Sequence, residues 1–236
     1  MTTVLSPAPR GPTVEEVPEL RAGDRLTRAE FERRYAAMPQ VKKAELIEGV
    51  VYMPSPASQE DHAGPHFNVI GWLAVYSAGT PGVQGGDNAT LRLDLDNEPQ
   101  PDAFLRILPD WGGQSYDSGK YVGGAPELIF EVAASSASYD LHDKLHAYRR
   151  NEVREYVVWR VWDRAIDWFV LREDLYERLA PNAGGQYQSR VFPGLWLDPA
   201  ALLRGDLAQV LAVLQQGLAS SEHAEFVSRL DGQRTG

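Results

Sequence analysis

A carboxylate inside a short apolar run is the feature of this sequence with the clearest capacity for chemistry. The run is Leu128-Ile129-Phe130-Glu131-Val132-Ala133, which is rich in strand-forming residues. Strand alternation places Glu131 on a face that is otherwise apolar, and the opposite face is apolar too, as in a central strand covered on both sides. An ionised carboxylate there is costly unless a cation, a proton or hydrogen-bond donors compensate it. The run alone therefore leaves two interpretations open, a structural salt bridge and a functional site.

A lysine follows on the helix predicted after this strand. Leu141, Lys144, Leu145 and Tyr148 have the i, i+3, i+4, i+7 spacing of one helical face. Lys144 thus lies at the edge of a stripe that is otherwise apolar. A lysine in such a place either extends its ammonium to solvent or points back toward Glu131, one connection earlier.

A second carboxylate precedes the run. Pro101-Asp102 opens another strand-like segment, which continues as Ala103-Phe104-Leu105. If this strand lies next to that of Glu131, the two carboxylates could share a divalent cation. Two carboxylates with water completing the coordination shell suit Mg²⁺, with Mn²⁺ as the alternative.

Other candidates are weaker. His62 and His66 have the i, i+4 spacing that could suit a metal, but Gly64-Pro65 lies between them and no third ligand is evident. We therefore interpret them as surface or capping histidines. The tryptophans around Trp159 and Trp168 favour sheet packing over a base-stacking platform.

Composition narrows the class of protein. The chain has 236 residues, 43% of them hydrophobic and 24% charged, which predicts one good-sized soluble domain. It lacks cysteine, which excludes disulfides, thiolate zinc sites and a cysteine nucleophile. With neither a signal-peptide pattern nor an apolar run of the roughly 20 residues needed to span a membrane, a cytoplasmic protein is expected. The net charge of −10 argues against a surface for non-specific nucleic-acid binding, but carboxylate-bound metal ions can still meet phosphate.

The order of predicted elements is that of a mixed α/β domain with one sheet. A capping box at Thr27 predicts a helix to about Ala37, and Glu48-Gly49 predicts a tight hairpin turn. The other predicted elements are helices at 58–77 (with a break at Gly64-Pro65) and 139–150, strands at 90–95, 102–108, 128–133, 156–161 and 166–171, shorter strands at 175–178, 187–191 and 195–197 completing a sheet edge, a last helix with apolar residues from Leu207 to Leu218, and loops at 79–86 and 109–124.

Several of these residues carry a resemblance. Pro101-Asp102 followed by Glu131-Val132-Ala133 resembles the active-site signature of the PD-(D/E)XK, restriction-endonuclease-like superfamily. Segments over about residues 25–200 resemble its Uma-type branch of bacterial endonucleases. These segments are Ala44-Glu45-Leu46-Ile47-Glu48-Gly49-Val50-Val51, Pro54-Ser55-Pro56 with His62, Ala125 to Val132, Tyr139-Asp140 to Lys144-Leu145 with Tyr148, Val153 to Tyr156, and Phe192 to Leu195.

The sequence departs from the family pattern at three places. Ala133 stands where the signature has its lysine, and in this branch the lysine comes from the following helix, which maps to Lys144. Ser135-Ser136-Ala137 replaces the usual Ser-Pro-Ser, and Arg154 replaces a proline. Neither of the last two changes touches an expected metal ligand.

The resemblance implies a restriction-endonuclease-like fold, with a central mixed sheet flanked by helices and extra antiparallel hairpins. It further implies a metal-dependent endonuclease that hydrolyses DNA phosphodiester bonds. Asp102, Glu131 and the Val132 carbonyl would hold Mg²⁺, and Lys144 and Glu45 would complete the catalytic set. The alternative is a catalytically inactive nuclease-fold protein that acts as a DNA-binding or protein-interaction module. The geometry of Asp102 and Glu131 discriminates between the two.

Composition and apolar spacing, together with the resemblance, suggest a domain organisation. We expect a flexible arm over residues 1–22, the nuclease domain over 23–205, and a C-terminal helix and tail over 206–236. The last helix packs on the body of the chain or on a second subunit, so a homodimer stays open.

Overall fold

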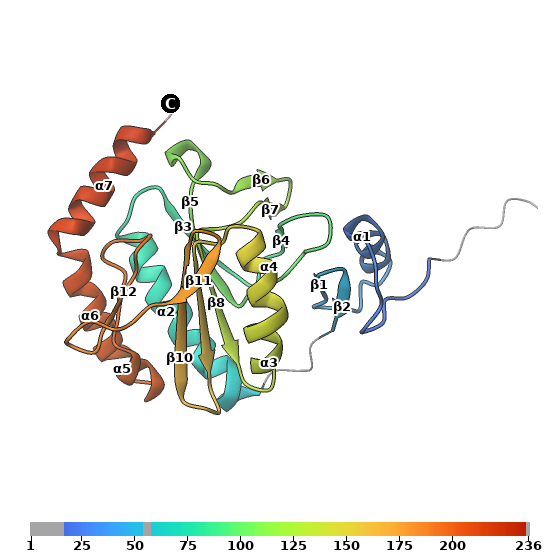
Figure 1. Cartoon of the computed structure of the whole chain (residues 1–236), viewed down its shortest axis with the longest axis horizontal. Coiled ribbons are helices and arrows are strands. Elements are labelled where there is room, and N and C mark those ends of the chain that lie inside the picture. The colour runs from blue at the N-terminus through green and yellow to red at the C-terminus, as the bar shows by residue number, and fades with distance from the viewer. Residues whose placement is uncertain (1–16, 54–57, 235–236) are drawn as a thin grey trace, which may run out of the picture.

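The centre of the fold is a six-stranded sheet. A computed structural model describes residues 17–53 and 58–234. The strand order is β11-β10-β9-β8-β5-β3, in which β8 and β9 are parallel and all other neighbours are antiparallel (Figure 1). The mixed α+β architecture predicted from the sequence is confirmed. The strands are β3 (Val83–Asp87), β5 (Ala103–Ile107), β8 (Leu128–Ala133), β9 (Glu155–Arg160), β10 (Ala165–Arg172) and β11 (Leu175–Arg178).

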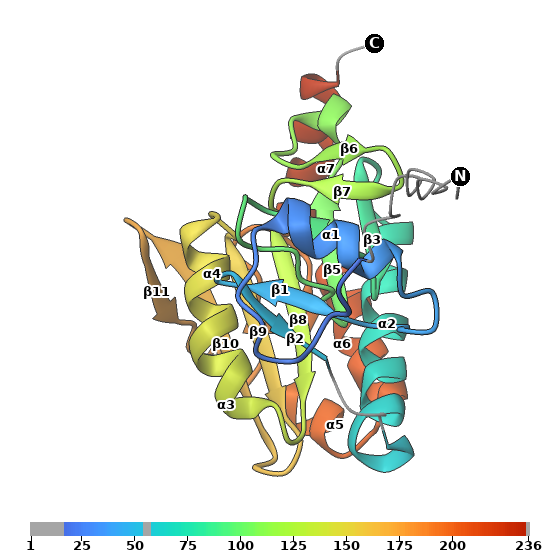
Figure 2. The ribbon, with the colours of Figure 1, turned by 90° about the vertical axis from the view of Figure 1, so that its right-hand side faces the viewer.

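The predicted central strand is β8, and all six of its residues are buried. Because β8 and β9 are parallel, the chain must cross over between them, and it does so through a helical segment. This segment comprises α3 (Ala137–Tyr139), the π-helical turn η3 (Asp140–Lys144) and α4 (Leu145–Arg150). It covers the sheet face that carries Glu131 (Figure 2).

The opposite face of the sheet holds the larger apolar core. It is covered by α2 (Gly64–Ala78), α5 (Pro199–Leu203) and α6 (Leu207–Leu218) (Figure 2). Trp72 of α2 packs edge-on against Phe130 and Trp168, which accounts for the predicted role of Trp168 in sheet packing. The helix is not interrupted at Gly64-Pro65, because the π-helical turn η1 (Gln59–Ala63) runs directly into α2; only the type of helix changes at the predicted break.

The N-terminal part of the described chain, residues 17–53, forms a small lobe beside the sheet (Figure 1). It contains α1 (Arg28–Ala36) and the hairpin of β1 (Glu45–Ile47) and β2 (Val50–Tyr52), around a separate apolar cluster. The predicted cap is present, since the Thr27 side chain accepts from the Glu30 N–H. Glu48 and Gly49 have φ of 51° and 72°, as a two-residue hairpin turn requires. Both local predictions are confirmed.

The stretch 79–86 was predicted as a loop, and this is wrong in its second half. Val83–Asp87 is β3, the edge strand paired with β5. Its two glycines give no strand signal, but Gly86 is needed there because an added Cβ would lie 2.2 Å from the Phe104 ring. The strand is thus specified by its neighbour and not by its own residues.

The stretch 109–124 was predicted as one long loop, which is also wrong. It contains the 3-10 turn η2 (Pro109–Trp111) and the strands β6 (Tyr116–Ser118) and β7 (Tyr121–Gly123). These strands form a small sheet with β4 (Leu91–Arg92). Short strands of mixed polarity have no clear pattern in the sequence, so they are recognised only from their pairing in the structure.

The C-terminal third differs from expectation in two ways. Strands β12 (Tyr187–Gln188) and β13 (Trp196–Leu197) pair with each other and do not extend the main sheet edge. The helix predicted from the apolar spacing is α6, and a further helix, α7 (Ser221–Gln233), follows it. The division into arm, domain and tail stays a prediction, and residues 1–16 and the Pro54-Ser55-Pro56 motif lie outside the described residues. Of the helices in the described part, none has the length and hydropathy of a membrane span.

Candidate active site

Strand register brings the two predicted carboxylates together. Ala103 of β5 pairs with Phe130 of β8, so Asp102, one residue earlier, lies opposite Glu131. Side chains directly opposite in an antiparallel pair share a face. The Asp102 N–H lies 3.4 Å from Glu131 Oε2, and the Val132 N–H donates to Asp102 Oδ2 at 2.8 Å. Both carboxylates are buried, so the proximity expected from the sequence is present in the fold.

Lys144 points inward at these carboxylates. Its Nζ lies 2.8 Å from Glu131 Oε1, 3.1 Å from Glu45 Oε1 and 3.6 Å from Asp140 Oδ1. The residue is 3% exposed, so the alternative that it extends to solvent is wrong. The Tyr148 hydroxyl, one turn further along the same helical face, donates to Glu131 Oε1 at 3.0 Å. The helical stripe therefore supplies two donors to one carboxylate oxygen.

Glu45 reaches the site from the N-terminal lobe. It is the first residue of β1, and its side chain is buried. Besides Lys144, its Oε1 accepts the Gln100 N–H at 2.8 Å, next to the Pro101-Asp102 pair. The lobe thus completes the surroundings of Lys144, in agreement with the place expected for Glu45.

The interpretation of His62 and His66 as surface or capping residues is wrong. His62 Nε2 lies 3.1 Å from Asp102 Oδ2. His66 Nε2 lies 2.8 Å from the Asp102 carbonyl oxygen and 3.1 Å from Asp87 Oδ1. Helical structure continues from η1 into α2 through Gly64-Pro65, which keeps both histidines on one face. Their i, i+4 spacing was the available signal, and the proline obscured it.

Two further charged residues of the site were not singled out from the sequence. Lys43 Nζ lies 3.7 Å from Asp102 Oδ1 and donates to Asn88 Oδ1 at 3.2 Å. Asp140 is buried beside Lys144. Lys43 stands two residues before Glu45, the first residue of β1, and this closeness in sequence was the signal available for it.

Burial and charge act on Glu131 in opposite senses. Burial raises the pKa of Glu131 to about 8, with Lys144 acting against the rise and Asp102 and Asp140 adding to it. Burial favours the neutral form of Lys144, but the carboxylates of Glu131, Glu45 and Asp140 hold its pKa well above its usual value. Lys144 is therefore the fixed cation of the cluster, and Glu131 binds a proton more tightly than an ordinary glutamate does.

Asp102 is shifted in the other direction. Burial opposes its ionisation, but the hydrogen bond with His62 and the charge of Lys43, together with the Val132 N–H, hold the pKa of Asp102 below its usual range. The two facing carboxylates thus differ in their affinity for protons. Such a split is typical of sites where two acidic groups have different tasks.

The cluster fits a divalent cation. Glu45, Asp102, Glu131 and Asp140 bring four carboxyl groups against the two ammonium groups of Lys43 and Lys144. Glu131 Oε2 has only the long contact with the Asp102 N–H among the hydrogen bonds of the described residues. Within the same residues, no group of three or more Asp, Glu or His side chains is arranged so that it could hold a metal ion. Mg²⁺ does not require such a group, because it is bound through one or two carboxylates and keeps several waters.

The backbone adds one more oxygen. The Val132 N–H faces Asp102, and in an extended strand the carbonyl of the same residue points to the same side. Continuing the register places Pro101 opposite Val132, and a proline has no N–H to donate to that carbonyl. The Val132 carbonyl is thus placed to serve as the expected backbone ligand.

Comparison with known proteins identifies the family. The model of the Uma2 family, described as "Putative restriction endonuclease", matches residues 28–200. The chain belongs to the Uma2 family. The match spans the lobe from α1 onward, the central sheet and every site residue named above. No protein of curated function matches the sequence.

The fold of this Uma2 chain is also similar to a solved structure. It is the crystal structure of a "putative nuclease belonging to DUF820" from Anabaena variabilis ATCC 29413, with 14% sequence identity and a TM-score of 0.54. The similarity covers 73% of this chain and 97% of the other. At this level of identity, it establishes a shared fold.

Proposed function

We propose that this Uma2 protein is a Mg²⁺-dependent endonuclease that hydrolyses phosphodiester bonds of DNA, with Mn²⁺ as an alternative ion. The observation that carries the proposal is the buried pair of Asp102 and Glu131, facing each other on adjacent strands with Lys144 against Glu131. Family membership gives this geometry its chemical context.

Three groups would hold the ion: the Asp102 and Glu131 carboxylates and the Val132 carbonyl. A bound ion there supplies charge to polarise the phosphate and acidify the attacking water. The carboxylates are preorganised for this by the Val132 N–H, the Asp102 N–H and the Tyr148 hydroxyl. The excess of carboxyl over ammonium groups favours a dication at this point.

Lys144 would orient the attacking water and offset negative charge that develops on the phosphate. Its ammonium group is already desolvated and fixed by Glu45 and Asp140, so no reorganisation is needed during the reaction. Glu45 acts mainly by holding Lys144 in place, and it could also contact the ion through water.

The DNA backbone would approach beside Lys43 and His62. Their side chains are 28% and 26% exposed, whereas that of Asp102 behind them is 5% exposed. A phosphate entering here meets the Lys43 ammonium before it reaches the carboxylates. This local cation explains how a chain with net charge −10 could admit DNA.

A plasmid-cleavage assay tests the proposal. The wild type should convert supercoiled DNA to nicked or linear forms with Mg²⁺ or Mn²⁺, and EDTA should stop the reaction. Asp102→Asn keeps the shape of the side chain but removes a ligand charge, so its cleavage should fall by about 10³-fold. Absence of cleavage by the folded wild type with either ion and with several DNA forms would favour the non-catalytic alternative. Equal cleavage by the Asn variant would place the chemistry elsewhere.

A further inference from the structure

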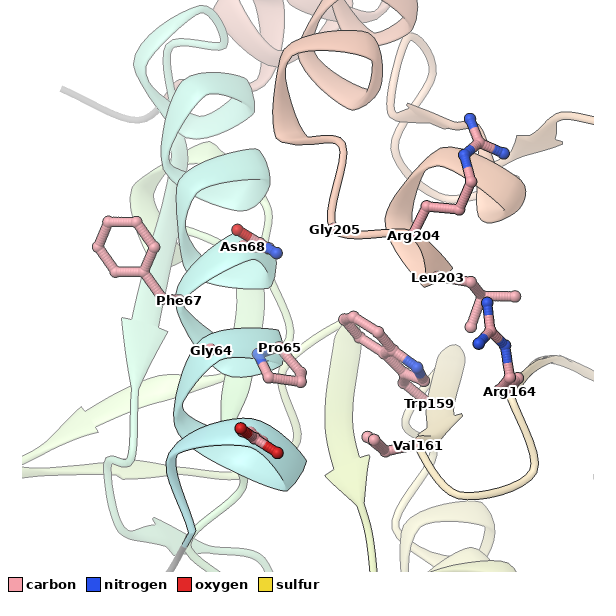
Figure 3. Close-up of a pocket in the computed structure, with 11 residues that line it drawn as sticks. Gly64, Pro65, Phe67, Asn68, Trp159, Val161, Arg164, Leu203, Arg204 and Gly205 are labelled. Atoms are coloured by element: carbon pink, nitrogen blue, oxygen red, sulfur yellow. The ribbon is translucent and has the colours of Figure 1, made fainter.

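A groove outside the carboxylate site lies on the other face of the sheet (Figure 3). It has a volume of about 480 Å³, within the roughly 300–1,000 Å³ typical of ligand sites. Trp159 forms its floor, and Pro65 and Asn68 of α2 line one wall. The opposite wall is built from the turn after β9 and the connection between α5 and α6, which bring Arg164 and Arg204.

The two arginines give the groove its chemical character. Both are exposed, and among the described residues neither side chain has an ion pair or hydrogen bond. Their neighbour Arg160, by contrast, is paired with Asp163 and Asp167. The acidic residue on the lining is Glu60. In a chain of net charge −10, two uncompensated guanidinium groups beside an apolar floor indicate an anionic ligand with a planar or apolar part.

The groove is connected to the carboxylate site by the chain itself. The η1–α2 segment presents His62 and His66 to Asp102, while Gly64, Pro65 and Asn68 line the groove. On the sheet side, the Val161 N–H donates to the Ala133 carbonyl, two residues beyond Glu131 on β8. The η1–α2 segment therefore borders both the proposed site of cleavage and the groove, and the end of β9 that lines the groove is hydrogen-bonded to the end of β8 beyond Glu131.

We propose that this groove binds a single-stranded stretch of DNA flanking the phosphate that is cleaved. The inference rests on the proposed function and adds a path for the strand. Arg164 and Arg204 would contact backbone phosphates, and a base would lie toward Trp159 and Pro65. Positive side chains that follow the backbone, combined with apolar surface for bases, are the usual means of binding a single strand without sequence preference.

The test measures binding without cleavage, in EDTA, using a fluorescent single-stranded oligodeoxynucleotide and anisotropy. Arg204→Glu should weaken binding about tenfold or more, because an attraction to phosphate is replaced by repulsion. Arg190→Glu is the matched control, since Arg190 is also exposed, has no side-chain ion pair among the described residues and lies outside the groove lining. Arg164→Gln is the second variant in case Arg204→Glu does not fold. Removal of one arginine that binds a phosphate should reduce the slope of log affinity against log salt by about 0.7.

The outcomes separate this inference from the proposed function. Weaker binding by the groove variants and not by Arg190→Glu supports the groove, whether or not the wild type cleaves DNA with Mg²⁺. Equal affinities for wild type and groove variants overturn it, even if cleavage is observed. Inorganic polyphosphate serves as a competitor without bases. If polyphosphate and unlabelled DNA displace the oligonucleotide equally at the same phosphate concentration, the groove recognises negative charge alone and not bases. The proposed strand path is then wrong.

Discussion

Glu131→Gln is expected to abolish DNA cleavage while leaving the metal-free protein at least as stable as the wild type. The amide keeps the shape of the side chain and can still accept from Lys144 and Tyr148. Where Glu131 is ionised, the substitution removes a buried charge that faces Asp102 and Asp140, so the relief of repulsion offsets the weaker interaction with Lys144. Cleavage should fall on the order of 10³-fold or more, because the ion no longer has one of its charged ligands.

The gain in stability should depend on pH. Burial raises the pKa of Glu131 to about 8 from an unfolded value near 4.5, so the folded wild type holds a proton that the unfolded chain has released. The contribution of Glu131 to the free energy of unfolding is fully present below about pH 4.5. It is lost as the pH rises to about 8, by up to about 1.4 kcal/mol per pH unit. The Gln variant does not lose stability in this way. In EDTA, its free energy of unfolding relative to that of the wild type should therefore increase from pH 5 to pH 8.5.

Other buried carboxylates titrate in the same range. Burial raises the pKa of Glu155 to about 7 and that of Glu98 to about 8. Both are present in wild type and variant alike, so the difference between the two melting curves isolates Glu131. A Gln variant destabilised by about 1–3 kcal/mol, with unaltered cleavage, would show that Glu131 is only a structural partner of Lys144.

Lys144→Met is expected to damage both fold and activity. The methionine keeps an apolar stem, but Glu45, Glu131 and Asp140 lose the cation that lies among them. Removing one member of a buried ionic cluster costs about 3–5 kcal/mol at pH 8. The cost should be smaller at pH 5, because burial raises the pKa of Glu131 to about 8 and this group is then protonated. Hydrolysis should fall by about 10² or more at temperatures where the variant is folded.

Lys42→Met is the matched control, because Lys42 is exposed, and its stability should change by less than about 0.5 kcal/mol. Adding Glu131→Gln to Lys144→Met should recover part of the missing stability, since the two residues are in contact. Chemical denaturation at pH 5 and pH 8 measures both effects. Cleavage by Lys144→Met at the wild-type rate would restrict the lysine to a structural role.

The elements with strong local signals could be predicted from the sequence. The β8 strand, the Thr27 cap and the turn at Glu48-Gly49 each have residues that specify their own conformation. The position of Lys144 on an apolar stripe, one connection after a carboxylate in a central strand, left extension to solvent and contact with Glu131 as the two alternatives, and the contact is the one present. In these cases the local pattern and the tertiary structure require the same residue types.

The parts that were missed depend on partners distant in sequence. The β3 strand exists because β5 lies beside it and Phe104 occupies the space over Gly86. His62 and Lys43 reach Asp102 from segments 40 and 59 residues away in the chain, and their spacings to His66 and to Glu45 do not identify Asp102 as their partner. Apolar periodicity carries no information about which polar side chains meet across elements.

The effect of Mg²⁺ on thermal unfolding tests the assignment of the site most directly. If Asp102 and Glu131 hold a divalent ion in the folded state, the ion stabilises that state, because a ligand that binds only the folded chain raises the melting temperature with its concentration. We predict that Mg²⁺ raises the melting temperature of the wild type and that Asp102→Asn loses this increase. In EDTA the melting temperature of Asp102→Asn should be lower than that of the wild type, because the interactions of the Asp102 carboxylate with His62, Lys43 and the Val132 N–H are weakened. An equal increase in wild type and Asp102→Asn would contradict the assignment of the site.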